Sequence, residues 1–167
     1  MDEKKIQEYL ARQDISIEGS IATWEMRLEG EIQGTYTGTF RFRCFLTPTQ
    51  RLAAGREYRE LLGNNPQLAL PHEDNLAFSL SQLKYRILSA PPFWTSTIQQ
   101  NSVAGDLPDE NIIDAVLDAA VASELKYKAQ LKQRKIDAIE RAKKAAERML
   151  QRRDEEDHEG ESTEASD

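Results

Sequence analysis

Residues 35–63 constrain the fold most, because a strand pattern here runs directly into a helix-start signal. Apolar residues or glycine alternate with polar ones over 36–46, which is typical of a strand with one buried face. Residues 47–50 (TPTQ) have the composition of a capping box with proline at the first helical position. Gly63 stands where a left-handed residue would end a helix over 48–62. The stretch therefore predicts a strand, a tight junction and a capped helix.

A second alternating stretch begins at Ile21 and precedes this strand. A glycine-containing loop at 33–35 separates the two, so residues 21–46 predict an antiparallel β-hairpin. Because two strands alone are only marginally stable in water, helices or further strands must cover them. Residues 14–18 fit either a connector or a first extended piece. Cys44 lies on the apolar side of the second strand, and we expect a buried thiol that packs as a small hydrophobe rather than a reactive one.

The middle of the chain predicts two helices. In the helix over 48–62 we expect four side chains to point toward a core: Leu52, Tyr58, Leu61 and Leu62. A second helix is expected over 72–89, where apolar residues recur at helical spacing and need a partner helix: Leu76, Leu80, Leu83 and Ile87. Prolines 91 and 92 end this helix, because the residue before a proline avoids helical geometry.

A long last helix is expected after Asp106, since no glycine or proline occurs between Asp109 and Asp157. Its first turns have an apolar packing face, whereas beyond Lys126 the large apolar residues thin out to Leu131, Ile136, Ile139 and Met149. Some forty residues would reach about 60 Å at ~1.5 Å per residue, more than the width of a small domain. We therefore expect the distal half to extend from the core, alone or in a coiled coil with a partner helix.

Charge is segregated along the chain. Residues 124–153 carry 11 basic and 4 acidic residues, whereas residues 154–167 carry 8 acidic and no basic ones. The last stretch has almost nothing apolar to bury, so we expect it to be disordered. The sequence thus predicts an α+β protein with an N-terminal helical arm (1–18), a core domain (19–123), an extended basic helix (124–153) and an acidic tail (154–167).

No constellation of catalytic residues stands out, and we expect no enzyme activity, cofactor or metal. His72 and His158 have no histidine or cysteine at ligand spacing. The glycines of GEIQGTYTG are not followed by the strand–loop–helix of a phosphate-binding loop. No apolar run approaches membrane-spanning length, and the N-terminus lacks a signal-peptide core, so we expect a soluble protein of a reducing compartment. The basic stretch 126–153 could contact phosphates of a nucleic acid or be a solvated helix face, and its scattered charges favour the second interpretation.

Phe93 and Trp94 follow the double proline and have two possible roles. Large aromatic residues beside rigid prolines can anchor a protein partner or close the core. With this alternative open, the candidate partner-binding residues are Phe93, Trp94, Leu131, Ile136 and Ile139. An edge strand of the hairpin is a further feature that could recruit a partner.

A hairpin whose second strand has an F-x-F-R-x-x-L-T pattern, followed by a capped helix and a mostly helical remainder, resembles the tail assembly chaperones of tailed bacteriophages. The resemblance covers residues 20–125 and is carried by Phe40, Phe42, Arg43, Leu46 and Thr47, by the corner at 91–94 and by Gly105, Asp106, Leu107 and Asp109. It implies a non-enzymatic, oligomeric protein of the host cytoplasm that coats the tape measure protein and recruits tail-tube subunits.

Two other classes remain open at this point. One is a structural component of the virion, in the neck, head decoration or baseplate. The other is a nucleic-acid-associated helical protein.

Overall fold

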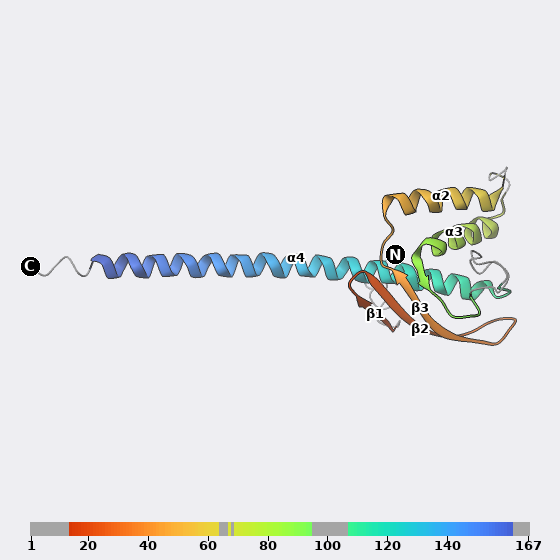
Figure 1. Cartoon of the computed structure of the whole chain (residues 1–167), viewed down its shortest axis with the longest axis horizontal. Helices are drawn as coiled ribbons and strands as arrows, with labels where there is room; N and C mark the ends of the chain where they lie inside the picture. The colour runs from red at the N-terminus through yellow and green to blue at the C-terminus, as the bar shows by residue number, and fades with distance from the viewer. Residues whose placement is uncertain (1–13, 64–66, 68, 95–106, 162–167) are drawn as a thin grey trace, which may run out of the picture. The chain divides into compact units, whose positions relative to one another are not determined.

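The computed structural model describes residues 14–63, 67, 69–94 and 107–161, and side chains as far as residue 149. The fold is α+β, as the sequence predicts (Figure 1). The chain forms two compact units, residues 1–127 and 128–167. Its elements in order are β1 (Ile15–Glu18), β2 (Ile21–Glu29), β3 (Thr35–Arg43), α2 (Pro48–Leu62), α3 (Pro71–Arg86), β4 (Ile87–Ser89) and α4 (Glu110–Glu161).

The predicted hairpin is the centre of a four-stranded antiparallel sheet with the order β1-β2-β3-β4. Trp24 pairs with Phe40, and their side chains lie on the buried face. The turn is longer than predicted, because β2 ends at Glu29 and the Gly30 amide donates to the Gly34 carbonyl at 2.6 Å. Gly34 has φ 79°, a left-handed conformation that glycine adopts without strain.

The two outer strands are short. β1 shows that residues 15–18 are the extended piece rather than a connector. β4 corrects the predicted helix over 72–89, because α3 ends at Arg86 and Ile87–Ser89 pairs with β3 instead. The β-branched Ile87 and the nearby prolines disfavour further helix, and the free edge of β3 supplies hydrogen-bond partners. The pairing includes a register shift between Arg41 and Phe42.

The predicted start and end of α2 are confirmed. The Gln50 amide donates to Thr47 Oγ1 at 3.3 Å, and the Thr47 amide donates to Gln50 Oε1 at 3.0 Å, which is the reciprocal capping box. At the other end Gly63 has φ 71° and its amide donates to the Glu60 carbonyl. α3 begins one residue earlier than predicted, at Pro71, where the Glu73 carboxylate accepts from the Leu70 amide at 2.9 Å.

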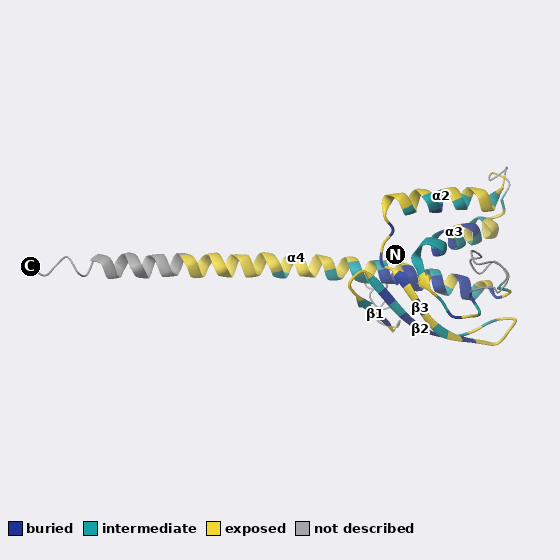
Figure 2. Cartoon of the chain, viewed as in Figure 1, coloured by how far each residue is buried: buried dark blue, intermediate teal, exposed yellow. Residues whose placement is uncertain are grey.

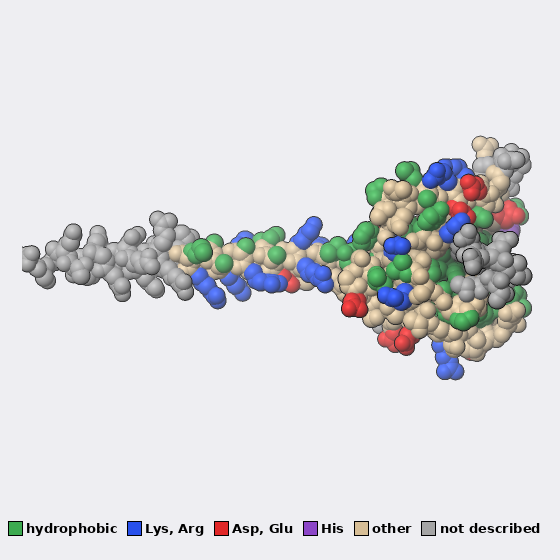
Figure 3. All heavy atoms as spheres, in the orientation of Figure 1, with side chains coloured by type: hydrophobic (Ala, Val, Ile, Leu, Met, Phe, Trp, Pro, Cys, Tyr) green, Lys and Arg blue, Asp and Glu red, His purple; other side chains and the backbone are tan. Residues whose placement is uncertain are grey.

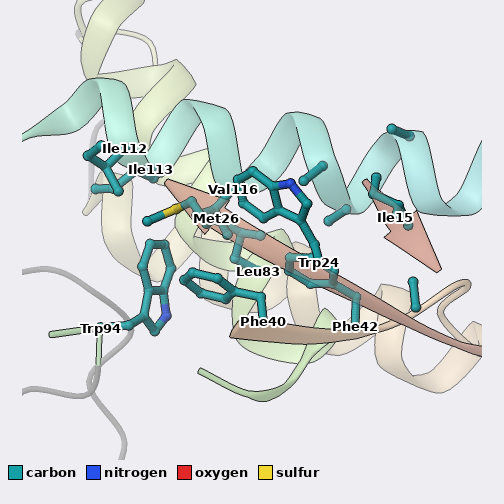
Figure 4. Close-up of a cluster of buried hydrophobic side chains, with 14 of the residues drawn as sticks. Ile15, Trp24, Met26, Phe40, Phe42, Leu83, Trp94, Ile112, Ile113 and Val116 are labelled. Carbon is teal, nitrogen blue, oxygen red and sulfur yellow. The ribbon is translucent and has the colours of Figure 1, made fainter. Parts of the chain in front are cut away.

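One apolar core lies between the sheet and the first turns of α4 (Figure 4). Ile112, Ile113 and Val116 face the sheet residues, which form a run of aromatic contacts. The Phe40 and Phe42 rings stack with centroids 5.7 Å apart. Cys44 is fully buried at the end of this run, as predicted. Each large side chain here contributes about 1.5–3 kcal/mol by leaving water.

The expected inward face of α2 is corrected in part (Figure 2). Leu52 is 71% exposed and Leu61 is 48% exposed, and Ala54 is the buried residue of this helix. α2 packs on α3, and the ion pair of Glu57 with Lys84 at 2.7 Å links the two helices. The two leucines stay largely outside this contact.

α4 begins at Glu110 and runs to Glu161, so it continues past Arg153 into the acidic stretch. Its expected end at residue 153 is therefore not observed. Residues 162–167, the expected cap Asp106 and residues 1–13 of the expected N-terminal arm lie outside the described residues.

Candidate protein-binding surface

Trp94, a predicted partner-binding residue, belongs to the core. It is 3% exposed, and its ring meets Phe40 edge-on with centroids 5.2 Å apart. Phe93 is half-buried and packs edge-on against Tyr36 at 5.0 Å. The structure therefore shows the core-closing role of this corner, and the interpretation of Trp94 as an exposed anchor is wrong.

Glycine 38 explains how the proline corner reaches the sheet. A Cβ at Gly38 would lie 2.3 Å from Cγ and 2.5 Å from Cβ of Pro91, far inside contact distance. The buried Pro91 thus occupies the space that a side chain on β3 would fill. This close approach sets Phe93 and Trp94 against the aromatic run.

The other predicted residues are exposed on the helix of the second unit. Leu131 is 38% exposed, Ile136 41%, Ile139 57% and Met149 71%. Figure 3 shows apolar side chains alternating with Lys and Arg along the described part of this helix. We define the α4 stripe as the apolar residues that fall on one side of the helix at spacings of three and four: Leu131, Ala138, Ile139, Ala142, Ala145, Ala146 and Met149. Ile136 lies about 60° around the helix beyond Ile139 and is outside the stripe.

The opposite side of the helix is polar. Gln133 donates to the Asp137 carboxylate at 2.8 Å, an i,i+4 contact that supports a solvated helix face. The stripe has a different character, because its four alanines let another helix approach closely and its larger residues offer knobs for packing. Such an arrangement has the small and large apolar residues that helix packing uses.

A second apolar surface lies on α2 and α3, and the sequence did not predict it. Leu52, Leu61, Leu70 and Phe78 are each about half exposed or more. A groove of about 400 Å³ lies beside them and is lined by Leu61, Leu62, Ala69, Glu73, Leu76, Ala77 and Leu80. The expected seam of α3 is thus divided, since Leu83 is buried while Leu76 and Leu80 line the groove.

The outer strands cover the edges of the hairpin only in part. β1 pairs with residues 21–24 of β2, and β4 pairs with Arg41 and Phe42 of β3. Among the described residues, 25–29 of β2 and 35–40 of β3 have no strand on their outer side, so strand addition to the hairpin stays a prediction.

A buried carboxylate joins the hairpin turn to the start of α4. Asp109 is 1% exposed and accepts hydrogen bonds from the Ile32 amide at 2.6 Å, the Gln33 amide at 3.0 Å and the Tyr36 hydroxyl at 2.7 Å. Burial acts to raise the pKa of Asp109, but these donors and the Glu31 amide outweigh it and hold the pKa below its ordinary value. Burial, followed by the bond to Asp109, raises the pKa of Tyr36 to about 12.

The hydrogen bonds of this junction hold the hairpin turn against the start of α4. Both carboxylate oxygens already accept bonds from the turn and from Tyr36, and almost no surface is left for a substrate. A Cβ at Gly30 would lie 2.7 Å from Asp109 Oδ2, so the turn needs glycine to close around the carboxylate. The sequence did not predict this contact, because Asp109 is more than seventy residues from its donors. The sequence feature that could have indicated it is an aspartate directly before a helix.

An ion pair inside the first unit connects α3 to α4. Arg86 Nη2 lies 2.8 Å from Glu124 Oε2, with side chains 11% and 15% exposed. Among the described residues, Arg86 Nε and Nη1 have no hydrogen-bond acceptor.

Burial, with Glu124 contributing, raises the pKa of the Cys44 thiol, which keeps it protonated and unreactive.

Other kinds of site are not assembled in the described chain. Within residues 14–63, 67, 69–94 and 107–161, no group of three histidine, cysteine or acidic residues is placed to hold a metal ion. Among the helices described, none has the length and apolarity to cross a membrane. Comparisons with protein families, curated proteins and solved structures gave no match.

Proposed function

We propose that this chain is a non-enzymatic protein–protein interaction protein that binds its partner through the α4 stripe. The observation that carries the proposal is the exposure of Leu131, Ile136, Ile139 and Met149 on one helix, in a unit whose described side chains bury none of them. Exposed apolar surface of this kind usually marks an interaction site.

The large side chains of the stripe support only part of a binding free energy. Leu131, Ile139 and Met149 are 38%, 57% and 71% exposed, so burying what is still exposed is worth about 2.5–5 kcal/mol at roughly 1.5–3 kcal/mol per full side chain. Binding also costs translational freedom and side-chain order, which subtract several kcal/mol. We therefore expect a stable complex only where the partner also packs against the alanines of the stripe.

We propose that the setting is the assembly of a phage tail, with the chain acting as a chaperone of tape measure and tail-tube proteins in the host cytoplasm. The resemblance of residues 20–125 to tail assembly chaperones supports this setting, and an exposed helix stripe fits a protein that holds a long partner. A structural virion protein is the alternative, and the two differ in where the protein ends up. A chaperone is absent from purified particles, whereas a structural protein is present at a fixed copy number.

Site-specific photo-crosslinking in infected cells tests the proposal. A crosslinking residue at position 139 lies on the stripe, and the matched control at position 144 lies on the opposite side of the same helix. We expect position 139 to give adducts with tape measure or tail-tube protein, identified by mass spectrometry, and position 144 to give few.

Equal labelling from both positions would contradict the stripe as the binding surface. Adducts with neither protein would contradict the chaperone role. Retention of DNA that falls steeply with salt would instead support the nucleic-acid class.

A further inference from the structure

The carboxylates of residues 128–149 all lie on the side of α4 that faces away from the α4 stripe. This stretch carries eight basic and three acidic residues. At about 100° of rotation per residue, Asp137, Glu140 and Glu147 lie about 140–160° around the helix from Ala142, which is at the middle of the stripe. The surface that a partner of the stripe would cover therefore presents no negative side chain between residues 128 and 149.

Basic side chains border the stripe on both of its flanks. Arg134, Arg141 and Arg148 recur every seven residues on one flank, about 80–120° from the middle of the stripe. Lys132 and Lys143 lie on the other flank, about 80–100° from the middle. All five side chains are exposed. The stripe is thus an apolar surface between two positive borders.

The arginine flank finds no counter-ion on its own helix. Among the described residues, Arg134, Arg141 and Arg148 take part in no ion pair. Asp137 is the one carboxylate at a spacing of three or four residues from any of them, and it accepts a hydrogen bond from Gln133 at 2.8 Å instead. The charge of this flank is therefore available to an outside group.

We propose that the partner of the α4 stripe presents an amphipathic helix with carboxylates beside its own apolar seam, an inference that rests on the proposed function of the stripe. The alanines of the stripe let a second helix approach closely, and arginines seven residues apart match acidic side chains that recur once per heptad on that helix. Opposite charges at the borders attract such a partner, and the same borders repel a helix with basic flanks.

Two other occupants match the surface less well. A second copy that pairs through its own residues 128–149 would bring positive borders together, because that stretch has no carboxylate on the stripe side. A nucleic acid would satisfy the arginines through its phosphates. It would leave Leu131, Ile139 and Met149 without an apolar partner, although these side chains lie between the two borders.

Binding of two synthetic peptides to the full chain tests the chemistry of the partner. Both peptides have about four heptads with the same leucine and alanine seam, which is long enough for a helix, and they carry either Glu or Lys beside that seam. Fluorescence anisotropy gives the dissociation constants at about 50 mM and about 500 mM salt. We expect the Glu peptide to bind at least about tenfold more tightly at the lower salt, and this preference to shrink at the higher salt because screening weakens exposed charge pairs.

Two variants of equal charge change show whether the flank is responsible. Arg134→Gln, Arg141→Gln and Arg148→Gln together lower the net charge by three, and the control pair Gln133→Glu and Lys144→Glu lowers it by the same three on the side opposite the stripe. We expect the triple variant to raise the dissociation constant of the Glu peptide roughly tenfold and the control to change it less than about twofold. Circular dichroism of both variants checks that the helix content is unchanged.

Ile139→Gln separates a helix from a nucleic acid. It should weaken the Glu peptide severalfold, because it removes a large apolar contact from the stripe, and it should leave the binding of a short DNA duplex unchanged. Equal affinity for the two peptides, an equal loss in the triple variant and its control, or tighter binding of the duplex than of the Glu peptide would each overturn the proposal. Photo-adducts from position 139 with a second copy of the chain, rather than with another protein, would also overturn it.

The results separate this inference from the function on which it rests. Adducts from position 139 with tail proteins, combined with no preference for the Glu peptide, refute the acidic helix and leave the proposed function standing. A preference for the Glu peptide that depends on the arginine flank, combined with adducts to a protein outside the tail, supports the acidic helix and refutes the chaperone role.

Discussion

Replacing Trp94 with alanine separates the two roles that the sequence allowed for this residue. The indole is 3% exposed and contacts Phe40 edge-on at 5.2 Å. An aromatic side chain that buries about 150–250 Å² gains roughly 4–6 kcal/mol at ~25 cal/mol per Å². Measured truncations of buried Phe or Trp to alanine cost about 3–5 kcal/mol. We therefore expect Trp94→Ala to lower the free energy of unfolding by about 4 kcal/mol.

Urea denaturation followed by circular dichroism measures this loss, and thermal denaturation should show a fall in Tm of about 15 °C. Phe78→Ala is the matched control because it removes an aromatic ring that is 50% exposed on α3. Its cost should stay below about 1.5 kcal/mol, since much of that ring is already in water.

The burial argument also predicts what Trp94→Ala leaves unchanged. At temperatures where the variant is folded, partner capture through the α4 stripe should be retained, because the stripe lies in the other compact unit. A loss of stability below about 1 kcal/mol, combined with lost partner binding, would refute the placement of Trp94 in the core.

Three further predictions test separate contacts. Gly38→Ala should lower the free energy of unfolding by about 1–3 kcal/mol, because the new Cβ would clash with Pro91. Gly55→Ala is the control: its Cβ would meet nothing closer than 4.0 Å, and it should raise the free energy of unfolding by up to ~1 kcal/mol. Urea denaturation midpoints compare the two variants, and equal effects would contradict the close approach at Gly38. The pKa of Tyr36 is raised from 10.0 to about 12, so the stability that its hydroxyl contributes is complete below pH 10 and is lost as the pH rises toward 12. The pKa of Asp109 is lowered, so the stability that its carboxylate contributes is present above pH 3.8 and is lost as the pH falls through the lowered pKa. Tyr36→Phe should therefore show a smaller fall in stability than the native chain between pH 10 and 12, and parallel curves would argue against the hydroxyl–carboxylate bond. Glu124→Ala should lower the free energy of unfolding by about 3–5 kcal/mol, because it leaves Arg86 buried without its counter-ion. Arg86→Met combined with Glu124→Leu should recover most of that loss. A double variant whose loss equals the sum of the two single losses would contradict the pairing.

Local signals along the chain predicted the parts of the fold that local physics determines. The capping box at 47–50 and the positive φ of Gly63 are confirmed, because both depend on residues within a few positions of each other. The buried alternation of β2 and β3 is confirmed for the same reason, since period two in the sequence directly describes one face of a strand.

Features that depend on distant partners were missed. Residues 87–89 have no strand pattern of their own and become β4 because β3 has an edge to pair with. Leu52 and Leu61 occupy apolar positions of α2, but the helix packs on α3 with both of these side chains about half exposed or more. Helical spacing states which residues share a face; it does not state which face the neighbouring element covers.

The sequence predicted the exposed residues of α4 but not the role of Trp94 or the junction at Asp109. Leu131, Ile136 and Ile139 are exposed, as a binding surface requires, and their role in partner binding stays a prediction. The sequence left Trp94 either as an anchor for a partner or as a core residue, because the glycine on β3 that admits this corner is more than fifty residues away. The junction at Asp109 was missed because its donors come from a turn far back in the chain.

The short border strands have a consequence for the edges of the sheet. β1 covers residues 21–24 of β2 and β4 covers Arg41 and Phe42 of β3, so the turn end of the hairpin has no neighbouring strand on either outer side among the described residues. Backbone amide and carbonyl groups at such an edge can pair with an extended segment of any other chain. The turn end of the hairpin is therefore where an added strand would have backbone to pair with.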